Sequence, residues 1–410
     1  MHILFLTDNF PPEVNAPASR THEHAREWVR AGHEVTVVTC APNFPTGRLF
    51  DGYRNRLRQS ETVDGIRVVR VWTYITANEG FLTRSLDYAS FMASAILAAP
   101  FERRPDVVVA TSPHFFTAIA GYMVSRMRRR PFVFELRDLW PESIRAVGAM
   151  SDGRLFRTLE RIELFLYRRA DAVVSVTHAF RHDLARRGID PRKVHVVTNG
   201  ADLSRYMPRP RDEALAASLG LEGKTVAGYF GTHGLAHALD TLLRAGRRLE
   251  AEGRDDIRIL LLGAGAQKAA LEEEAERMGL RSVIFLDTVP KCEIPRYWSL
   301  LDLSIIHLKK SELFTTVIPS KMFECMAMGV PILHGVRGES AAIVERSGAG
   351  ITFEPEDDAE LADRLKALAD DPAWRRHLAE RGPEAARGYD RSALANELLK
   401  VLKTVTGTTT

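Results

Sequence analysis

Short, unbroken runs of apolar residues alternate with segments of helical periodicity along almost all of this 410-residue chain, and this pattern limits its fold more than any other feature. A strand that is apolar at every position is buried on both faces, as in a parallel sheet covered by helices. The pattern starts again after the turn signal Asn199-Gly200-Ala201-Asp202 and a linker-like stretch at 206–211. The sequence therefore predicts an α/β protein with two doubly wound parallel-sheet domains joined near residue 205.

The expected elements are spread along both halves. In the first half we expect strands at 3–7, 34–39, 66–72, 106–110, 132–136, 172–176 and 195–198. In the second half we expect strands at 225–230, 257–262, 282–286, 303–307 and 330–334. Helices are expected at about 20–31, 85–99, 114–128, 155–169, 237–251, 267–278, 295–301, 320–328, 358–368, 372–387 and 392–404. Ligands of such sheets bind at the carboxyl ends of the strands, which for two lobes points to the cleft.

Charge is distributed unevenly along the chain. The net charge of +3 is too small to argue for a nucleic-acid partner. Residues 1–200 hold 28 Lys and Arg against 21 Asp and Glu, whereas the remainder holds 28 against 32. A basic first half suits an anionic partner such as a phospholipid surface or a pyrophosphate carrier. A solvated surface rich in arginine is the alternative interpretation.

The cysteines and the apolar segments bear on the compartment. Cys40, Cys292 and Cys325 are far apart and odd in number, so they predict neither a disulfide framework nor a zinc site and favour a reducing compartment. The first residues resemble a strand, not a signal peptide, and the longest apolar stretch, 88–100, is too short to span a bilayer. We therefore expect a cytoplasmic protein.

The segment around Pro319, Ser320 and Lys321 is the strongest candidate for a binding site. A polar loop at 308–318 leads into it, and Pro319 and Ser320 are typical of a helix start. The first turn of a helix offers free N–H groups and the positive end of its dipole, and Lys321 adds a cation, so the segment suits a diphosphate. Glu324 lies one turn on and can accept both hydroxyls of a ribose. A capped surface helix with a Lys–Glu pair is the alternative.

Two glycine-containing turns follow predicted strands of the second half. Gly231, followed by Thr232 and His233, comes after the strand at 225–230, where glycine lets a ligand approach the backbone. Gly263 and Gly265 follow the next strand and resemble a truncated dinucleotide fingerprint that lacks its third glycine. Strand-to-helix turns often carry glycine, so a tight turn is the alternative for each.

Polar residues also end the predicted strands of the first half. Arg137 and Asp138 follow the strand at 132–136 and favour a site, with an ion pair that holds the loop as the alternative. Asn15 precedes the first helix, where it either caps the helix or contacts a substrate, as could Ser19. His114, like any lone histidine at a strand end, is more often a loop or capping residue than a catalyst.

Taken together, these motifs resemble the family 4 glycosyltransferases of the GT-B fold over nearly the whole chain. The resemblance rests on several shared stretches, of which the last is the most specific: Asn199-Gly200-x-Asp202, Gly231, Gly263-x-Gly265, Gly279-Leu280 with Val283-x-Phe285, and Glu324-x-Met326-Ala327-x-Gly329-x-Pro331. Other details resemble the bacterial branch that makes O-antigen, capsule and colanic acid, including WbuB-like transferases: Asn9-Phe-Pro-Pro-Glu13, Arg137-Asp138-Leu-Trp-Pro-Glu142 and Gly231-Thr-His-Gly-Leu-Ala-His237.

The resemblance implies a fold, a reaction and partners. It implies two Rossmann-like domains, with residues 1–204 binding the acceptor, residues 205–387 binding the nucleotide-sugar donor, and a final helix, about 388–410, that returns to the first domain. It implies a retaining transfer from a nucleotide-diphosphate sugar, UDP-sugars favoured, to a glycan or polyprenyl-diphosphate-linked acceptor. It implies no metal and no cofactor, because the nucleotide-sugar is a substrate.

Roles carried over from the family fall on matching positions. Glu324 should hold the donor ribose, and the backbone near Val289 should meet the base. The residues expected around the diphosphate are Gly231, Thr232, Ser320 and Lys321. His233 is a second candidate for phosphate contact, and Gly263 is also expected to bind the donor. The residues expected to contact the acceptor are Asn15, Arg20, Thr111, Arg137, Asp138 and His178.

The sequence departs from the family pattern at several points. The first glutamate of the paired motif should stand at position 316, where this chain has Thr316. The usual Arg and Lys after the first strand of the second domain are missing, with His233 and His237 nearby, and the family histidine of the first domain corresponds to Thr111. Lys321 is therefore the expected diphosphate cation.

The expected mechanism is a front-face transfer with Lys321, Glu324 and Asp138 as catalytic residues. Lys321 and the helix N-terminus stabilise the leaving diphosphate, and Asp138 orients the acceptor. Two rivals stay open: a sugar-nucleotide epimerase on the same scaffold, and a non-catalytic protein that binds nucleotide-sugars or lipid surfaces. Peripheral contact with the anionic inner face of the plasma membrane, through 81–99 with Arg103 and Arg104 or through 126–130, is a further hypothesis.

Overall fold

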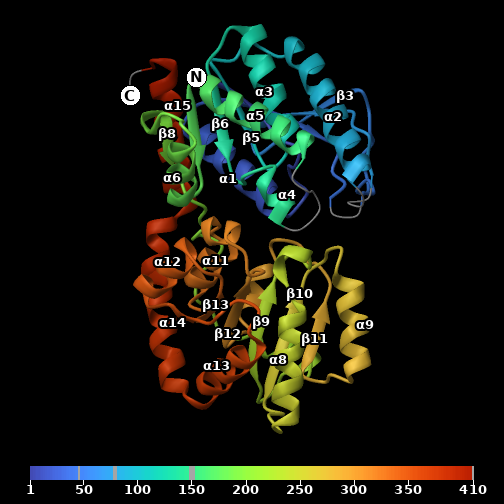
Figure 1. The fold of residues 1–410 in the computed structure, drawn as a ribbon, viewed down its shortest axis with the longest axis vertical. Coiled ribbons are helices and arrows are strands. Elements are labelled where there is room, and N and C mark those ends of the chain that lie inside the picture. The colour runs from blue at the N-terminus through green and yellow to red at the C-terminus, as the bar shows by residue number, and fades with distance from the viewer. Residues whose placement is uncertain (45–46, 77–80, 147–152, 409–410) are drawn as a thin grey trace. The chain divides into compact units, whose positions relative to one another are not determined.

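The structure is a computed structural model, and it describes residues 1–44, 47–76, 81–146 and 153–408. The chain forms two compact units. Unit 1 comprises Met1–Asn199 and Arg391–Thr410, and unit 2 comprises Gly200–Asp390. The division therefore falls at the Asn199-Gly200 turn, a few residues before the position expected from the sequence, and the last helix belongs to unit 1 (Figure 1).

Unit 1 contains an eight-stranded sheet with the order β3-β4-β2-β1-β5-β6-β7-β8. Its strands are β1 (His2–Leu6), β2 (Glu34–Cys40), β3 (Arg58–Val63), β4 (Ile66–Val71), β5 (Val107–Thr111), β6 (Phe132–Leu136), β7 (Ala172–Ser175) and β8 (Val194–Val196). Its helices are α1 (Ala16–Arg30), α2 (Phe81–Ala98), α3 (Phe115–Arg128), α4 (Glu142–Ala146), α5 (Arg154–Arg169), α6 (His178–Arg186) and α15 (Arg391–Thr406), with short 3-10 turns η1 (Ala99–Phe101) and η2 (Pro191–Lys193).

The strands of unit 1 pair in parallel, except for β3, which pairs with β4 in antiparallel fashion. The sequence analysis missed β3, because its side chains alternate between exposed and half-buried and form no apolar run. The signal was the Asp64-Gly65 turn, in which both residues have positive φ (49° and 79°). Such a turn joins two antiparallel strands into a hairpin.

The core of unit 1 explains why the final helix belongs to it. Apolar residues of α15 pack into the same cluster as strands β1, β2 and β5. The indole N–H of Trp28, a fully buried residue of α1, donates to the backbone oxygen of Ala395 in α15 (2.8 Å). A buried indole N–H needs such a partner, so this bond fixes where α15 lies on α1.

Unit 2 contains a six-stranded sheet, parallel throughout, with the order β11-β10-β9-β12-β13-β14. Its strands are β9 (Thr225–Phe230), β10 (Ile257–Leu262), β11 (Val283–Leu286), β12 (Leu303–His307), β13 (Ile332–Gly335) and β14 (Gly350–Thr352). Its helices are α7 (Glu213–Ser218), α8 (Asp240–Ala251), α9 (Lys268–Met278), α10 (Ile294–Trp298), α11 (Lys321–Met328), α12 (Glu339–Ser347), α13 (Asp358–Asp370) and α14 (Pro372–Ala386), with 3-10 turns η3 (Leu235–His237), η4 (Leu313–Thr316) and η5 (Arg387–Tyr389).

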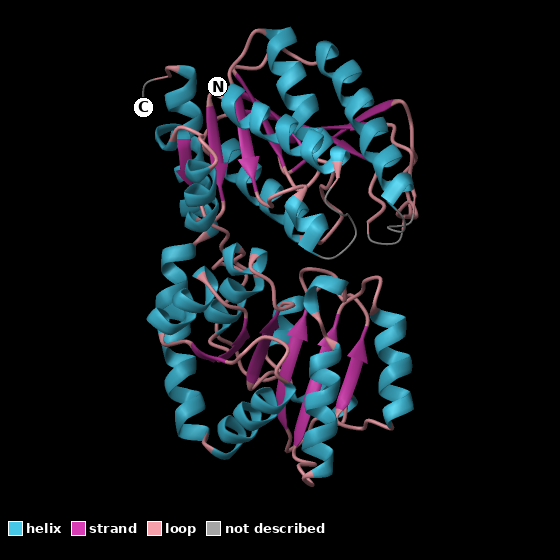
Figure 2. Ribbon diagram, viewed as in Figure 1, coloured by secondary structure: helices cyan, strands magenta, loops and turns pink. Residues whose placement is uncertain are grey.

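Each sheet thus lies within helices, as the alternation of apolar runs and helical segments predicted (Figure 2). The predicted fold class, two parallel-sheet α/β domains, is confirmed. The sequence analysis missed α6, α12 and β14, which are short elements without a long periodic pattern. Within the described residues, no helix combines the length and the apolar character that crossing a membrane requires.

Candidate functional site

Two loops of unit 2 pack backbone against backbone at the carboxyl ends of β9 and β10. The Gly231 N–H donates to the Leu262 oxygen, and the His233 N–H donates to the Ala264 oxygen (both 2.9 Å). A Cβ on Gly263, at φ 152°, would lie 1.9 Å from the Gly231 oxygen. The contact between the two loops therefore requires glycine at position 263, which fits the tight-turn interpretation.

Lys321, the first residue of α11, reaches back to the β9 loop. Its ammonium lies 3.4 Å from the centre of the Tyr229 ring. A Cβ on Gly231 would lie 2.9 Å from Nζ, so the missing side chain at Gly231 makes room for the ammonium. Nζ is buried and has no hydrogen-bond partner among the described residues. Burial lowers the pKa of Lys321 from its ordinary 10.5 to about 7.

A buried ammonium without an acceptor is costly, and an anion that enters the site would supply the missing partner. Tyr229 offers only the face of its ring, which attracts a cation without satisfying its N–H groups. The arrangement therefore suits a phosphate or carboxylate. Sequence reasoning missed Tyr229, although an aromatic residue two positions before Gly231 was a visible signal.

His233 and His237 lie close enough to Lys321 to feel its charge, and both are neutral at pH 7. The ring of His233 is buried, and neither ring nitrogen has a hydrogen-bond partner among the described residues. Burial, followed by the charges of Lys268 and Lys321, lowers the pKa of His233 to about 4. Burial likewise lowers the pKa of His237 to about 3. Neutral imidazoles can donate one hydrogen bond to a phosphate without competing with Lys321 for charge.

The other predicted donor residues lie around the same strand ends. Thr232 is exposed, and its backbone oxygen accepts from the Tyr229 hydroxyl (2.9 Å). Ser320 is the N-cap residue of α11, without a side-chain capping bond, and Glu324 is half-buried one turn further on. Val289 is half-buried beyond β11. The structure brings Gly231, His233, Gly263 and Lys321 together, while the ribose and base contacts of Glu324 and Val289 stay predictions.

Thr316 occupies the position where the family pattern has its first glutamate. Its hydroxyl donates to the Leu313 oxygen within η4 (2.6 Å). Gly338 packs directly against this loop, since a Cβ at position 338, where φ is 86°, would lie 2.0 Å from the Thr315 oxygen. The hydroxyl of Thr316 thus supports its own turn.

Arg20, a predicted acceptor contact, is held by partners within unit 1. It is fully buried, and its guanidinium donates to Glu135 Oε1 (2.9 Å) and to the Thr198 and Val197 oxygens (2.6 and 3.0 Å). Although burial acts in the opposite direction, the charges of Arg20 and Arg137 hold the pKa of Glu135 below its ordinary value. Arg20 thus joins α1, β6 and the segment after β8 and positions its neighbours, while its contact with an acceptor stays a prediction.

Arg137, unlike Arg20, has guanidinium N–H donors without a hydrogen-bond partner among the described residues. Its Nε and Nη1 are buried and have no hydrogen-bond partner among the described residues. Burial, with Arg20 and Arg391 nearby, lowers the pKa of Arg137 to about 9. The backbone N–H of Arg137 donates to the Ser112 hydroxyl (2.7 Å), which holds the loop after β6 against the end of β5. This guanidinium can accept an anionic group of a ligand.

Asp138, Thr111, Asn15 and His178 have mostly structural partners. Burial raises the pKa of Asp138, opposed by hydrogen bonds from the Ser143 side chain and the Leu139 backbone. Thr111 is buried and donates to the Ser112 oxygen (2.9 Å). Asn15 caps α1, accepting from the Ala18 N–H (2.9 Å), which was the structural alternative for this residue. His178 is exposed at the start of α6. Their contacts with an acceptor stay predictions.

Among the described residues, no three His, Cys, Asp or Glu side chains come together in a way that could hold a metal ion.

Family models match both halves of the chain. Residues 15–200 match the model of the glycosyl transferase 4-like domain, and residues 224–371 match that of the glycosyl transferases group 1. WcaI of Escherichia coli (strain K12), described as a colanic acid biosynthesis glycosyl transferase, is 25% identical over 341 residues, covering 80% of this chain and 82% of WcaI. A GDP-mannose-dependent alpha-mannosyltransferase of Mycobacterium tuberculosis is 26% identical over 81% of this chain and 78% of its own.

A solved structure supports the fold in the same way. Alr3699/HepE of Anabaena, in complex with UDP and glucose, superposes with a TM-score of 0.74 at 20% identity, over 98% of this chain and 99% of HepE. The two family models together cover both units of the fold, in the order that the two sheets occur along the chain. The chain therefore belongs to the glycosyltransferases of family 4, with the GT-B type of fold.

Proposed function

We propose that this protein is a retaining glycosyltransferase that moves a sugar from a nucleotide-diphosphate sugar to a glycan or lipid-linked acceptor of a bacterial surface polysaccharide. The observation that carries the proposal is the buried ammonium of Lys321, which lies over Tyr229 and beside Gly231 without a hydrogen-bond partner among the described residues. UDP-sugars are favoured as donors, in line with the UDP bound to HepE. The colanic acid assignment of WcaI supports the acceptor class.

The proposed reaction uses few protein groups. The diphosphate of the donor meets Lys321 and the positive end of the α11 dipole, where the side chain of Ser320 makes no capping hydrogen bond. As the bond between the anomeric carbon and the diphosphate breaks, these groups stabilise the developing negative charge. The acceptor hydroxyl then bonds to the same face of that carbon, and its proton passes to the leaving diphosphate. Lys321 supplies the charge that a metal ion would otherwise provide, so we expect turnover to survive chelation.

Further residues have proposed roles in binding. Glu324 holds the donor ribose, and Asp138 orients the acceptor. Arg137, whose Nε and Nη1 are buried and have no hydrogen-bond partner in the part of the chain that the structure describes, binds an anionic group of the acceptor such as a phosphate of a polyprenyl-diphosphate carrier.

Lys321→Ala tests the donor site. We expect it to lower the turnover of UDP-sugars by about two to three orders of magnitude, because a charged contact in the transition state is lost. Lys224→Ala is the matched control, since Lys224 lies at the amino end of β9 and bonds only to the Asp255 oxygen (2.7 Å) among the described residues. Near-normal turnover of Lys321→Ala would refute the assignment.

Incubation with donor alone separates the rivals. A sugar-nucleotide epimerase converts the donor without an acceptor, whereas a transferase releases nucleoside diphosphate in step with a glycosylated product. Nucleotide binding without turnover across an acceptor panel would instead support a non-catalytic binding protein.

We also propose that unit 1 contacts the anionic inner face of the plasma membrane. Exposed apolar side chains lie next to exposed arginines on α2, η1, α3 and the segments that follow them: Leu97, Phe101, Met123, Met127, Arg103, Arg104, Arg126 and Arg129. Apolar side chains can enter the interface while the arginines meet anionic headgroups. The predicted contact also included residues 81 and 82, whose side chains lie outside those described. Failure to float with anionic liposomes at low salt would contradict this proposal.

A further inference from the structure

A buried histidine of unit 2 joins two loops that follow different strands. His307 is the last residue of β12 and is buried. Its Nδ1 lies 2.8 Å from the backbone oxygen of His237, in the loop at residues 231–238 that contains η3, here called the η3 loop. Its Nε2 accepts from the backbone N–H of Glu356, beyond β14 (2.9 Å). The two ring nitrogens of His307 therefore bind the backbone of two loops that are far apart in the chain.

These two bonds determine where the ring of His307 carries its proton. A backbone N–H can only donate, so Nε2 must offer a lone pair to Glu356. The proton of the neutral ring then belongs on Nδ1, which donates to the His237 oxygen. Burial lowers the pKa of His307, which favours this neutral form. The ring thus has one donor and one acceptor, and both are used.

Packing holds the ring of His307 in this orientation. The imidazole stacks on the Phe353 ring at an interplanar angle of 6°, with ring centres 5.8 Å apart. A Cβ on Gly335 would lie 2.7 Å from Cδ2 of His307 and 2.4 Å from the Phe353 ring, so glycine at this position makes room for the stacked pair. The ring therefore cannot turn away from either backbone partner without losing this stack.

Both loops contain a residue with positive φ that is not glycine. Ala238, directly after His237, has φ 43°, and Glu356 itself has φ 65°. Residues with a Cβ rarely adopt this conformation, and it persists where surrounding contacts hold the backbone in place. His307 supplies such a contact to each loop, at Glu356 itself and at the residue before Ala238.

The η3 loop runs beside the candidate diphosphate site. Its first part, with Gly231 and His233, is bonded to the loop after β10. Its last part is bonded to the end of β12 by His307 and by the Lys309 N–H, which donates to the Ala236 oxygen (2.8 Å). The loop is therefore attached at both ends, and the side chain of His307 forms part of the second attachment.

We infer that His307 is a positioning residue of the donor site, which holds the η3 loop against β12 in the conformation that accepts the diphosphate of a nucleotide. Because His307 is buried, it acts through the backbone of His237 and not by contact with the donor. This inference rests on the proposed function and adds to it a residue outside the binding surface.

Two amide side chains separate the two bonds of His307. Asparagine places an amide N–H near the position of Nδ1 and is too short to reach the position of Nε2. His307→Asn should therefore keep the bond to His237 and lose the bond to Glu356. Glutamine places its oxygen near the position of Nε2, so His307→Gln should keep the bond to Glu356 and lose the bond to His237. His307→Phe keeps a ring and loses both bonds.

Calorimetric titration measures nucleotide binding, and melting curves of the ligand-free proteins measure stability. UDP and GDP are the probes, and the one that binds wild type more tightly is used throughout. His307→Gln and His307→Phe should bind it about tenfold more weakly than wild type, whereas His307→Asn should bind it within about twofold. His307→Asn should nevertheless melt at a lower temperature than His307→Gln, because its shorter side chain leaves a cavity and an unpaired Glu356 N–H.

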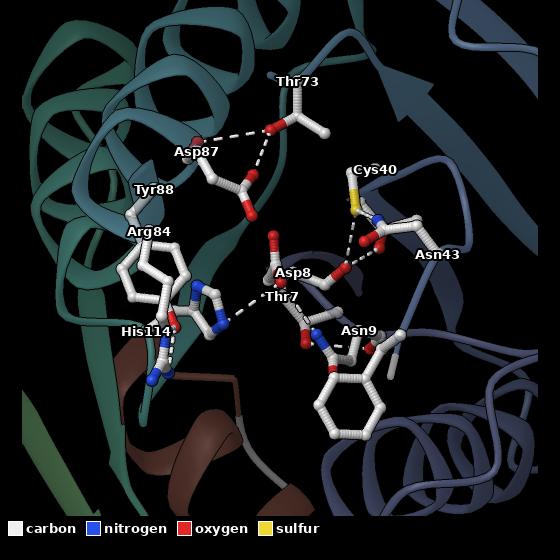
Figure 3. Close-up of polar contacts among 12 residues, drawn as sticks. Thr7, Asp8, Asn9, Cys40, Asn43, Thr73, Arg84, Asp87, Tyr88 and His114 are labelled. Atoms are coloured by element: carbon white, nitrogen blue, oxygen red, sulfur yellow. Dashed lines mark hydrogen bonds and ion pairs between the residues drawn. The ribbon is translucent and has the colours of Figure 1, made fainter. Parts of the chain in front are cut away.

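His114 of unit 1 provides the matched control. It also follows a strand, β5, and also lies against an aromatic ring, that of Tyr88, with ring centres 3.8 Å apart. Its Nε2 lies 3.1 Å from Asp8 Oδ2 (Figure 3). His114→Asn and His114→Gln make the same substitutions away from unit 2, and both should bind the nucleotide as wild type does.

The pattern among the variants distinguishes positioning from a general loss of stability. Weak binding confined to His307→Gln and His307→Phe supports the inference. If the affinities of the His307 variants follow their melting temperatures, if His307→Asn loses as much affinity as His307→Gln, or if all three bind as wild type does, the inference is overturned and the proposed function stands. If wild type binds neither UDP nor GDP, the proposed function fails and the inference fails with it.

Discussion

Replacing Lys321 with methionine should make the ligand-free protein more stable at neutral pH, although it removes the residue on which donor binding depends. Burial lowers the pKa of Lys321 from 10.5 to about 7, so the folded state binds this proton less tightly than the unfolded state. The penalty is complete below pH 7, where both states are charged. It decreases as the pH rises from 7 and vanishes near 10.5, where both states are neutral.

The size of the effect follows from this pKa difference. Each pKa unit corresponds to about 1.4 kcal/mol, which sets an upper limit of about 5 kcal/mol. Part of the Lys321 side chain reaches solvent and its ammonium is attracted to Tyr229, so we expect a gain of about 1–3 kcal/mol. Methionine keeps the length of the side chain and removes the charge.

Scanning calorimetry of the ligand-free protein across this pH range measures the effect. Lys321→Met should raise the melting temperature at about pH 6.5, and its advantage should shrink towards about pH 10. Lys224→Met, at a lysine already bonded to the Asp255 oxygen, should show no such trend. A Lys321→Met protein that is less stable than wild type at neutral pH, or equally stabilised at all pH values, would refute the reasoning.

Three other changes probe the fold and the sites. Gly263→Ala should destabilise unit 2 and abolish nucleotide binding, because its Cβ would lie 1.9 Å from the Gly231 oxygen. The control Gly253→Ala, whose Cβ would meet nothing within 4 Å, should lower the free energy of unfolding by only about 1 kcal/mol. Melting curves with and without UDP distinguish these outcomes. Arg20→Met should cost about 3–5 kcal/mol, because it leaves Glu135 buried without its ion pair, and an unchanged melting temperature would contradict this. Asp8→Asn should stabilise the protein above pH 7, where the buried carboxylate is charged, and lose this advantage below about pH 4, where the acid is protonated in both states.

Much of the fold could be predicted from the sequence because buried parallel strands have to be apolar at every position. Strands such as β5 and β6 are fully buried and stand out for that reason. The edge strand β3 does not stand out in the sequence, because its half-buried positions carry polar residues. Its sequence signal is the Asp64-Gly65 turn that follows it. Short elements such as β14 leave too few residues for a period to be recognised.

The candidate sites could be predicted only where their residues are neighbours in the chain. The helix start at Ser320 and Lys321 is local, and the sequence revealed it. The residues that contact the Lys321 ammonium are not local, because Tyr229 and Gly231 lie at β9, far earlier in the chain. The partners of Arg20 are not local either, since Glu135 and the segment after β8 are brought to it only by folding.

Calorimetric titration of UDP into wild type and Lys321→Met tests the central claim most directly. A diphosphate beside Lys321 must raise its pKa, so wild type should take up part of a proton at about pH 7.5, seen as a difference in binding heat between buffers of different ionisation enthalpy. Lys321→Met should bind UDP at least about tenfold more weakly and without that uptake. Equal affinity and equal proton uptake in the two proteins would contradict the account.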